Sequence, residues 1–293
     1  MNNIKGYIYA AASSSTFGLA PFFTISLLAS GFSSFEVLAY RWGIASLTLV
    51  IFGILLRETF RISRKDWGTI FVLSLLRAAT SLSLVIAYQH IASGVASTIH
   101  FMYPLAVALA MIFFFREKKS FSILFAVLVS LAGAALLSSG EIDFKGGNTT
   151  TGLIAATLSV FFYGGYIVGV RKSRAIHIPS TALTCYVMGL GALFFIIGGS
   201  LTGGIQLATG GQTWLNILGL ALPATAISNI TLVKAIKYIG PTLTSIFGAL
   251  EPLTAVAIGC MVFKESFTPG TVLGILLILT AVTVVIMHEK KTS

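Results

Sequence analysis

Three charged side chains, Arg41, Arg77 and Glu251, lie inside long apolar stretches of the sequence. A charge buried in apolar surroundings is costly unless it has a partner or a function. Two arginines and a carboxylate could hold an anionic ligand next to a group that takes up and releases a proton. The alternative is a buried ion pair, in which one arginine neutralises Glu251 and fixes the register of two helices.

A histidine and a tyrosine lie one helical turn apart, at His100 and Tyr103. Side chains three residues apart share a face of a helix, so both should face the same space. Histidine titrates near neutral pH, which makes His100 and Glu251 the candidates for carrying a proton. His100 could instead be a packing residue whose hydrogen bonds are satisfied.

Further polar and aromatic side chains could contact a ligand. Tyr163 and Tyr166 lie one turn apart, and Asn229 forms a polar patch with Thr225 and Ser228. For the tyrosines the alternatives are the apolar core or an aromatic belt at a membrane surface, although Tyr163 lies too deep in its apolar stretch for a belt. The hydroxyls of residues 13–16 are expected to bond within their own helix or to pack closely against a neighbour.

Several kinds of chemistry have no motif in this sequence. It has no phosphate-binding glycine loop, no ATPase motif, no metal cluster and no nucleophile set. Cys185 and Cys260 both lie in apolar stretches, without redox or metal spacing, and are predicted to be inert. We therefore expect no enzyme activity, no metal and no cofactor, and any energy for work should come from a gradient.

The elements that must position these residues are membrane helices. Of the 293 residues, 56% are hydrophobic and 10% charged, and the mean hydropathy is +0.94. A soluble domain carries about 25% charged residues, so lipid is the expected solvent. Apolar runs without strict alternation favour helices over a barrel. We predict an all-α integral membrane protein with ten transmembrane helices, at residues 5–29, 35–56, 67–89, 92–115, 121–139, 151–170, 181–199, 213–235, 240–263 and 269–288.

The positive charges predict the orientation of these spans. When the connections alternate between the two sides, 15 of the 19 Lys and Arg fall on one side, whereas only Lys145 and Lys264 fall on the other. The positive-inside rule then places both termini in the cytoplasm. The remaining two, Arg41 and Arg77, lie within spans, and Arg41 is close enough to the outer face that it could extend to the interface. The basic excess is read as a topology signal and not as a nucleic-acid-binding surface.

The two halves of the chain repeat. Residues 87–131 align without a gap to a segment 148 positions later, so that Pro104 meets Pro252, Tyr103 meets Glu251 and His100 meets Gly248. The first and sixth spans align at an offset of 146, which argues that the first span is a structural helix and not a cleaved leader. We predict two five-helix repeats, 1–140 and 150–288. An odd number of helices inverts the second repeat, and substrate sites lie at such interfaces.

These residues resemble the EamA-type branch of the drug/metabolite transporter superfamily, whose members have ten helices. The resemblance covers nearly the whole chain. It is carried by Phe17-Gly18 and Tyr163-Gly164, Tyr40-Arg41-Trp42, the segment from Ala87 to Pro104, Leu250-Glu251-Pro252-Leu253, and Phe263-Lys264-Glu265. It implies an exporter of amino acids, other metabolites or toxic compounds. The first repeat has Tyr103 where the second has Glu251, so a family role for the acidic residue applies to Glu251 alone.

Together these features predict a secondary transporter in a cell inner membrane. It would move a small metabolite, with an amino acid as the first candidate, by alternating access between the repeats. The alternatives are a broad-specificity drug exporter, a channel or a membrane sensor. Its partners would be the substrate, the bilayer and, if transport is coupled, protons. The predicted substrate-binding residues are Arg77, His100, Tyr103, Tyr163, Asn229, Gly248 and Glu251, with Arg41, Trp42 and Tyr166 as a second set.

Overall fold

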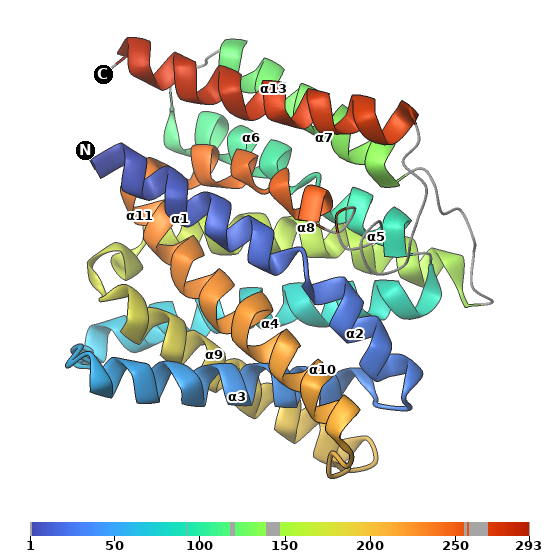
Figure 1. Ribbon diagram of the computed structural model, residues 1–293. Helices are drawn as coiled ribbons and strands as arrows, with labels where there is room; N and C mark the ends of the chain where they lie inside the picture. The colour runs from blue at the N-terminus through green and yellow to red at the C-terminus, as the bar shows by residue number, and fades with distance from the viewer. Residues whose placement is uncertain are drawn as a thin grey trace.

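The computed structural model describes residues 2–91, 93–117, 121–138, 147–254, 257 and 269–292, and all the regular structure in these residues is helical (Figure 1). The first half contains α1 (Asn2–Phe17), α2 (Ala20–Ala29), α3 (Ser34–Leu55), α4 (Trp67–His90), α5 (Ser93–His100), α6 (Tyr103–Phe115) and α7 (Phe121–Ser138). The second half contains α8 (Thr149–Lys172), α9 (Ser180–Leu201), α10 (Gly211–Ala221), α11 (Ser228–Phe247) and α13 (Pro269–Thr292). Short 3₁₀ helices at Arg64–Asp66 and Arg174–His177 precede α4 and α9, and a π-helix at Leu222–Ile227 joins α10 to α11.

Within the described residues, seven helical stretches are long and apolar enough to cross a membrane: Asn3–Ala29, Ser34–Leu55, Arg64–His90, Val95–Phe115, Thr149–Lys172, Ser180–Leu201 and Gly211–Phe247. Phe121–Gly133 and Val272–Val284 are apolar but shorter. The expected eighth span and the start of the ninth both fall in the 37-residue stretch Gly211–Phe247, which bends at Gly240 (φ 81°). The chain is therefore a multi-pass helical membrane protein, and the number ten stays a prediction.

The extensive helix–helix contacts join a helix of the first half to a helix of the second half. Helix α1 packs on α11, and α4, the counterpart of α11, packs on α8, the counterpart of α1. The other two extensive pairs join counterparts directly, α3 with α9 and α7 with α13. In Figure 1 the α7–α13 pair and the α3–α9 pair form opposite edges of the helical bundle. This arrangement is the one expected when two similar halves are related by a pseudo-two-fold axis.

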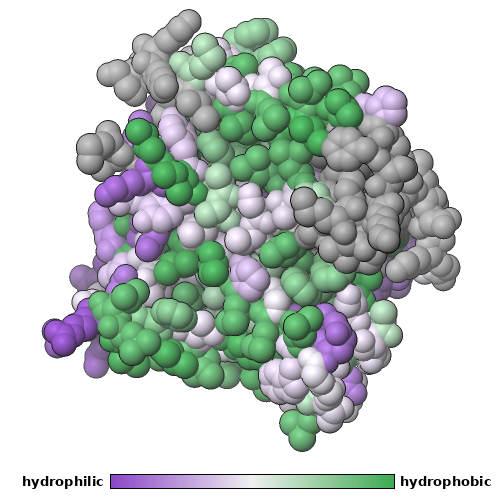
Figure 2. All heavy atoms as spheres, in the orientation of Figure 1, coloured by the Kyte–Doolittle hydropathy of each residue, from purple (hydrophilic) through white to green (hydrophobic). Residues whose placement is uncertain are grey.

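Both termini lie at one end of the molecule (Figure 1), which we call the terminal end. Basic residues tie the connections together there. Arg174 Nε forms a 2.7 Å ion pair with Asp66 Oδ1, Arg171 Nη1 donates to the carbonyl of Lys237 at 2.8 Å, and Lys237 Nζ donates to the carbonyl of Ile178. Figure 2 shows hydrophilic residues gathered at this end and apolar residues over most of the adjoining face.

At the opposite end, a capping box begins α3. Ser33 Oγ accepts from the backbone N–H of Glu36 at 3.3 Å, and Glu36 Oε2 accepts from the backbone N–H of Ser33 at 2.7 Å. The other carboxylate oxygen accepts from the backbone N–H of Gln206 at 2.7 Å. This single side chain therefore starts one helix and also fixes the loop that precedes α10.

Candidate functional site

Two prolines interrupt equivalent helices at the centre of the molecule. Pro104 and Pro252 have no N–H, so the carbonyls of His100 and Gly248, four residues earlier, lose their helical donors. Helix α5 accordingly ends at His100 and α6 begins at Tyr103, while α11 ends at Phe247 and helix resumes at residue 250. Membrane transporters commonly bind solutes at such discontinuous helices.

The two interruptions meet each other. The hydroxyl of Tyr103 donates to Glu251 Oε1 at 3.2 Å, which joins the two positions that the offset of 148 had made equivalent. Gly248 lies against the same tyrosine, since a Cβ atom there would overlap the Tyr103 hydroxyl. The Tyr103 hydroxyl therefore fills the space beside Gly248.

A third interruption brings the first span into the centre. Between α1 and α2 the chain leaves the helix near Gly18, and Pro21 lies in the first turn of α2. A Cβ on Gly18 would come within 2.5 Å of the carbonyl oxygen of Glu251, so only glycine permits this approach. The preceding residue, Phe17, stacks on Tyr163 with ring centroids 6.3 Å apart.

His100 is 3% exposed and its hydrogen bonds indicate its tautomer. Its Nδ1 lies 2.8 Å from Ser159 Oγ, and that hydroxyl already donates to the carbonyl of Ala156 at 2.6 Å. Ser159 must then accept, so Nδ1 carries the proton and Nε2 of the neutral ring offers a lone pair. Nε2 is buried and has no hydrogen-bond partner within the part of the chain that the structure describes. The alternative in which His100 is a packing residue with satisfied hydrogen bonds therefore accounts for Nδ1 but not for Nε2.

The rings of Tyr103 and Tyr163 complete the surroundings of His100. Tyr103 is 5.5 Å from the histidine ring, Tyr163 is 5.3 Å from it, and the two tyrosine rings meet edge to face at 4.6 Å. The expectation that His100 and Tyr103 face one space is therefore confirmed.

Arg77 is 1% exposed, and neutral groups surround it. Its Nε donates to Asn229 Oδ1 at 2.9 Å and its Nη1 donates to Ser81 Oγ at 3.4 Å. The guanidinium lies over the ring of Tyr163 at 5.0 Å and over the ring of Phe17 at 5.4 Å. Aromatic faces stabilise a cation in this geometry.

Arg41 is 4% exposed, so the alternative in which it extends to the membrane interface is wrong. Its Nε donates to Thr225 Oγ1 at 2.6 Å, and its guanidinium lies 5.6 Å from the Phe17 ring. Thr225 sits in the π-helix, where Pro223 interrupts the regular ladder and Thr225 Oγ1 donates to the carbonyl of Leu220 at 2.7 Å. Single π-helical turns are frequent at functional sites.

Neither arginine pairs with Glu251. Among the residues that the structure describes, the ion pair is Arg174 with Asp66, and Tyr103 is the hydrogen-bond partner of Glu251. The alternative in which an arginine serves as counter-ion to Glu251 is therefore not what the structure contains. Two guanidiniums remain buried among neutral partners.

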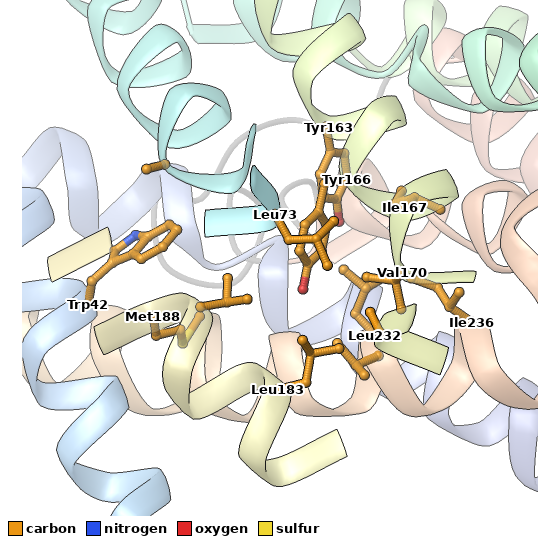
Figure 3. Close-up of a cluster of buried hydrophobic side chains, with 14 of the residues drawn as sticks. Trp42, Leu73, Tyr163, Tyr166, Ile167, Val170, Leu183, Met188, Leu232 and Ile236 are labelled. Carbon is orange, nitrogen blue, oxygen red and sulfur yellow. The ribbon is translucent and has the colours of Figure 1, made fainter. Parts of the chain in front are cut away.

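Trp42 and Tyr166, from the second set of predicted residues, are buried beside Arg77. Tyr166 is 0% exposed and Trp42 is 1% exposed, and among the described residues neither the Tyr166 hydroxyl nor Trp42 Nε1 has a hydrogen-bond partner. The guanidinium of Arg77 lies 5.9 Å from each of these rings. Beyond them, Leu73, Val170, Leu183, Leu232 and Ile236 form a buried apolar cluster (Figure 3).

The empty space lies on the other side of this centre. One pocket is lined by Phe17, Tyr88, Ser97, His100, Phe101 and Glu251. A neighbouring pocket is lined by Arg41 and Arg77 and shares Phe17 and Tyr88 with the first. Residues at the start of α2 and in the middle and second half of α4 line the two pockets. The Figure 3 cluster instead contains Leu73, in the half of α4 that begins at the terminal end.

Phe17 and Tyr88 touch this centre but were not predicted as site residues. The signal for Phe17 was present, because the offset of 146 places it opposite Tyr163 in an aromatic–glycine pair. Tyr88 lay in a segment used to establish the repeat and the family resemblance, and its hydroxyl is 3.3 Å from Ser97 Oγ. In the part of the chain that is described, no cluster of His, Cys, Asp and Glu has the arrangement of a metal site, and Cys185 is a buried free thiol.

Comparison with known proteins agrees with these features. Residues 4–139 and 150–287 each match the EamA-like transporter family. An uncharacterized transporter of Archaeoglobus fulgidus is 24% identical over 218 residues, which cover 73% of this chain and 74% of that protein. One crystal structure superposes with a TM-score of 0.82 over 100% of this chain and 98% of the other, at 16% identity, which shows the shared fold. The chain belongs to the EamA-like transporter family.

Proposed function

We propose that this chain is a secondary transporter that exports a small metabolite, with an amino acid or a related organic compound as the first candidate. The observation that carries the proposal is the contact between Tyr103 and Glu251 at two facing helix breaks, beside a pocket that His100 also lines. Glu251 bonds to Tyr103 and His100 bonds to Ser159, so a bond between Glu251 and His100 does not explain why both are buried here. They suit a site that takes up a solute or a proton.

Alternating access would use the two halves of the chain. In this proposal ten helices form two inverted repeats, and the interface between the repeats opens to one side at a time. The packed cluster in the terminal half and the pockets in the other half correspond to one of the two states. The positive-inside rule makes the terminal half cytoplasmic, in a cell inner membrane.

The proton is the proposed coupling ion, carried by Glu251 or by His100. Both side chains line the same pocket, and His100 has a free lone pair on Nε2 by the hydrogen-bond argument above. A solute that binds in this pocket would compete with or replace the proton, which is the requirement for exchange.

A broad-specificity exporter of toxic compounds is the second candidate. Its support is the aromatic lining of the pocket by Phe17, Tyr88 and Phe101 next to the carboxylate of Glu251, because such surroundings suit a lipophilic cation. The two buried arginines nearby favour the metabolite over the cation.

The test is a flux screen with the purified full chain in proteoliposomes. Vesicles loaded in turn with each amino acid, with small organic acids or with a lipophilic cation would be assayed for counterflow of the labelled compound. Saturable counterflow of an amino acid or organic acid is the expected result, and saturable counterflow of the cation alone would favour the second candidate. Flux that rises linearly with concentration would contradict a carrier and indicate a channel.

A further inference from the structure

Among the described residues, two positively charged side chains and no negatively charged one line a small pocket beside the pocket of Glu251. Arg41 and Arg77 both line it, together with the hydroxyl-bearing residues Thr24, Thr80 and Ser81. These five side chains are each at most 4% exposed, so water does not screen the charges. The apolar ring of Phe17 lies within 5.6 Å of both guanidiniums.

The polar partners of the two arginines are all neutral. Arg77 bonds to Asn229 and Ser81, and Arg41 Nε bonds to Thr225. Arg41 Nη2 is buried and has no hydrogen-bond partner among the residues that the structure describes. Because a guanidinium keeps its proton even when buried, the centre holds an uncompensated charge and a donor that lacks an acceptor. Both features call for an anion.

The shape of the site favours a carboxylate. A guanidinium matches the two oxygens of a planar carboxylate, and the pocket is narrow, with apolar walls at Leu84 and Val85. Leu84, Phe17 and Tyr88 also line the pocket of Glu251, so the two pockets are adjacent, and a molecule that occupied both would have to widen the small space beside the arginines. Its second end would meet the Glu251 carboxylate and the lone pair on His100 Nε2, which accept hydrogen bonds from an ammonium group.

We propose that Arg41 and Arg77 form a carboxylate-binding subsite, and that the transported solute is a zwitterion whose ammonium group lies beside Glu251. This rests on the proposed function in one respect, namely that the bound molecule is the one transported. The subsite itself is a statement about binding and can be tested without flux.

The test measures ligand-induced thermal stabilisation of the purified full chain in nanodiscs. The probes are leucine, 4-methylpentanoate, which keeps the carboxylate but lacks the ammonium group, and isoamylamine, which lacks the carboxylate. Acetate and further amino acids extend the set of probes, and sodium chloride supplies an inorganic anion. At least one carboxylate should stabilise the wild type at millimolar concentration, whereas chloride should not displace it. A wild type that no carboxylate stabilises would overturn the proposal.

Substitutions then locate the binding. Arg41→Gln and Arg77→Gln should each weaken the apparent affinity for the carboxylate at least about tenfold, since a charge-assisted hydrogen bond is lost. Arg41→Lys should recover part of the loss. Arg61→Gln, at an exposed position, is the matched control and should bind as the wild type does. Unchanged affinity in both glutamine variants would overturn the subsite.

Ser81→Ala covers the case in which the glutamine variants do not fold. It keeps both charges and removes one acceptor of Arg77, and should weaken carboxylate binding about threefold; unchanged binding would count against the subsite. Chloride that displaces the carboxylate at equal concentration would replace the proposal by a resident inorganic anion. Carboxylate binding without flux would overturn the proposed function alone, whereas flux of a solute that is insensitive to Arg41→Gln and Arg77→Gln would overturn the subsite alone.

Discussion

At the scale of the residue, Glu251 is the side chain that we propose as the proton carrier. Its partner is a tyrosine hydroxyl at 3.2 Å and not an arginine, so the carboxyl can gain or lose a proton without breaking an ion pair. Glu251→Gln keeps the shape but cannot exchange a proton, and should flatten the dependence of flux on pH. Glu58→Gln, on a loop at the terminal end, is the control. Unaltered pH profiles in both Glu251→Gln and His100→Gln would remove proton coupling from the mechanism.

Gly248 is the residue at which space is most restricted. A Cβ there overlaps the Tyr103 hydroxyl, whereas a Cβ on Gly43 of α3 meets no atom within 4 Å. Gly248→Leu should therefore displace Tyr103 from Glu251 and lower the rate of flux by about a hundredfold, the cost of displacing a reacting group by roughly 1 Å. Gly43→Leu should transport normally. Normal flux by Gly248→Leu at normal expression would place the pathway on other helix faces.

At the scale of the element, we expect the helix breaks to position the site. A substitution that lets one broken helix continue should therefore leave a folded protein with a lower rate of transport. The carbonyl of Gly248 accepts from the backbone N–H of Glu251 at 2.9 Å. Pro252→Ala adds the N–H that would bond this carbonyl in a regular helix and so lets the helix continue. We expect a higher melting temperature and a flux at least about tenfold lower, because Glu251 would turn away from Tyr103. Pro179→Ala, at the N-cap of α9, should change neither. A Pro252→Ala variant with full activity would show that the break has no role in transport.

The sequence predicted these elements better than their contacts. The aligned prolines at 104 and 252 predicted that Tyr103 and Glu251 are equivalent, and the structure brings them together. The sequence could not predict the π-helix at Leu222–Ile227, because one proline in an apolar span is compatible with several local backbone conformations. The partners of Arg41 and Arg77 were also beyond prediction, since they come from the second half of the chain at Thr225 and Asn229, and composition does not specify which helices meet.

At the scale of the whole molecule, packing differs between the two ends. Ser97 lines the pocket of Glu251, whereas Val233 is 0% exposed in the cluster that closes the terminal half. In a background without Cys185 and Cys260, Ser97→Cys should react with a membrane-impermeant thiol reagent from the side opposite the termini. Val233→Cys should resist the reagent from either side until solute shifts the equilibrium. Labelling of Val233→Cys and protection of Ser97→Cys in the absence of solute would indicate the opposite resting state.

We expect the distribution of charge over the molecule to determine its orientation in the membrane. The termini and the basic connections at residues 57–66 and 171–177 share one end (Figure 1), and most of the 19 Lys and Arg lie on that side in the alternating topology. Anionic lipid and the insertion machinery hold such segments in the cytoplasm. A reporter fused at Ser63 should therefore be active as a cytoplasmic marker, and one fused at Thr209, in the loop before α10, should report the opposite side. Phosphatase and fluorescent-protein fusions at both positions make the measurement, with a fusion after residue 293 as the second cytoplasmic control. Equal signals at Ser63 and Thr209 would contradict the ten-span topology, because an odd number of crossings must separate these two positions.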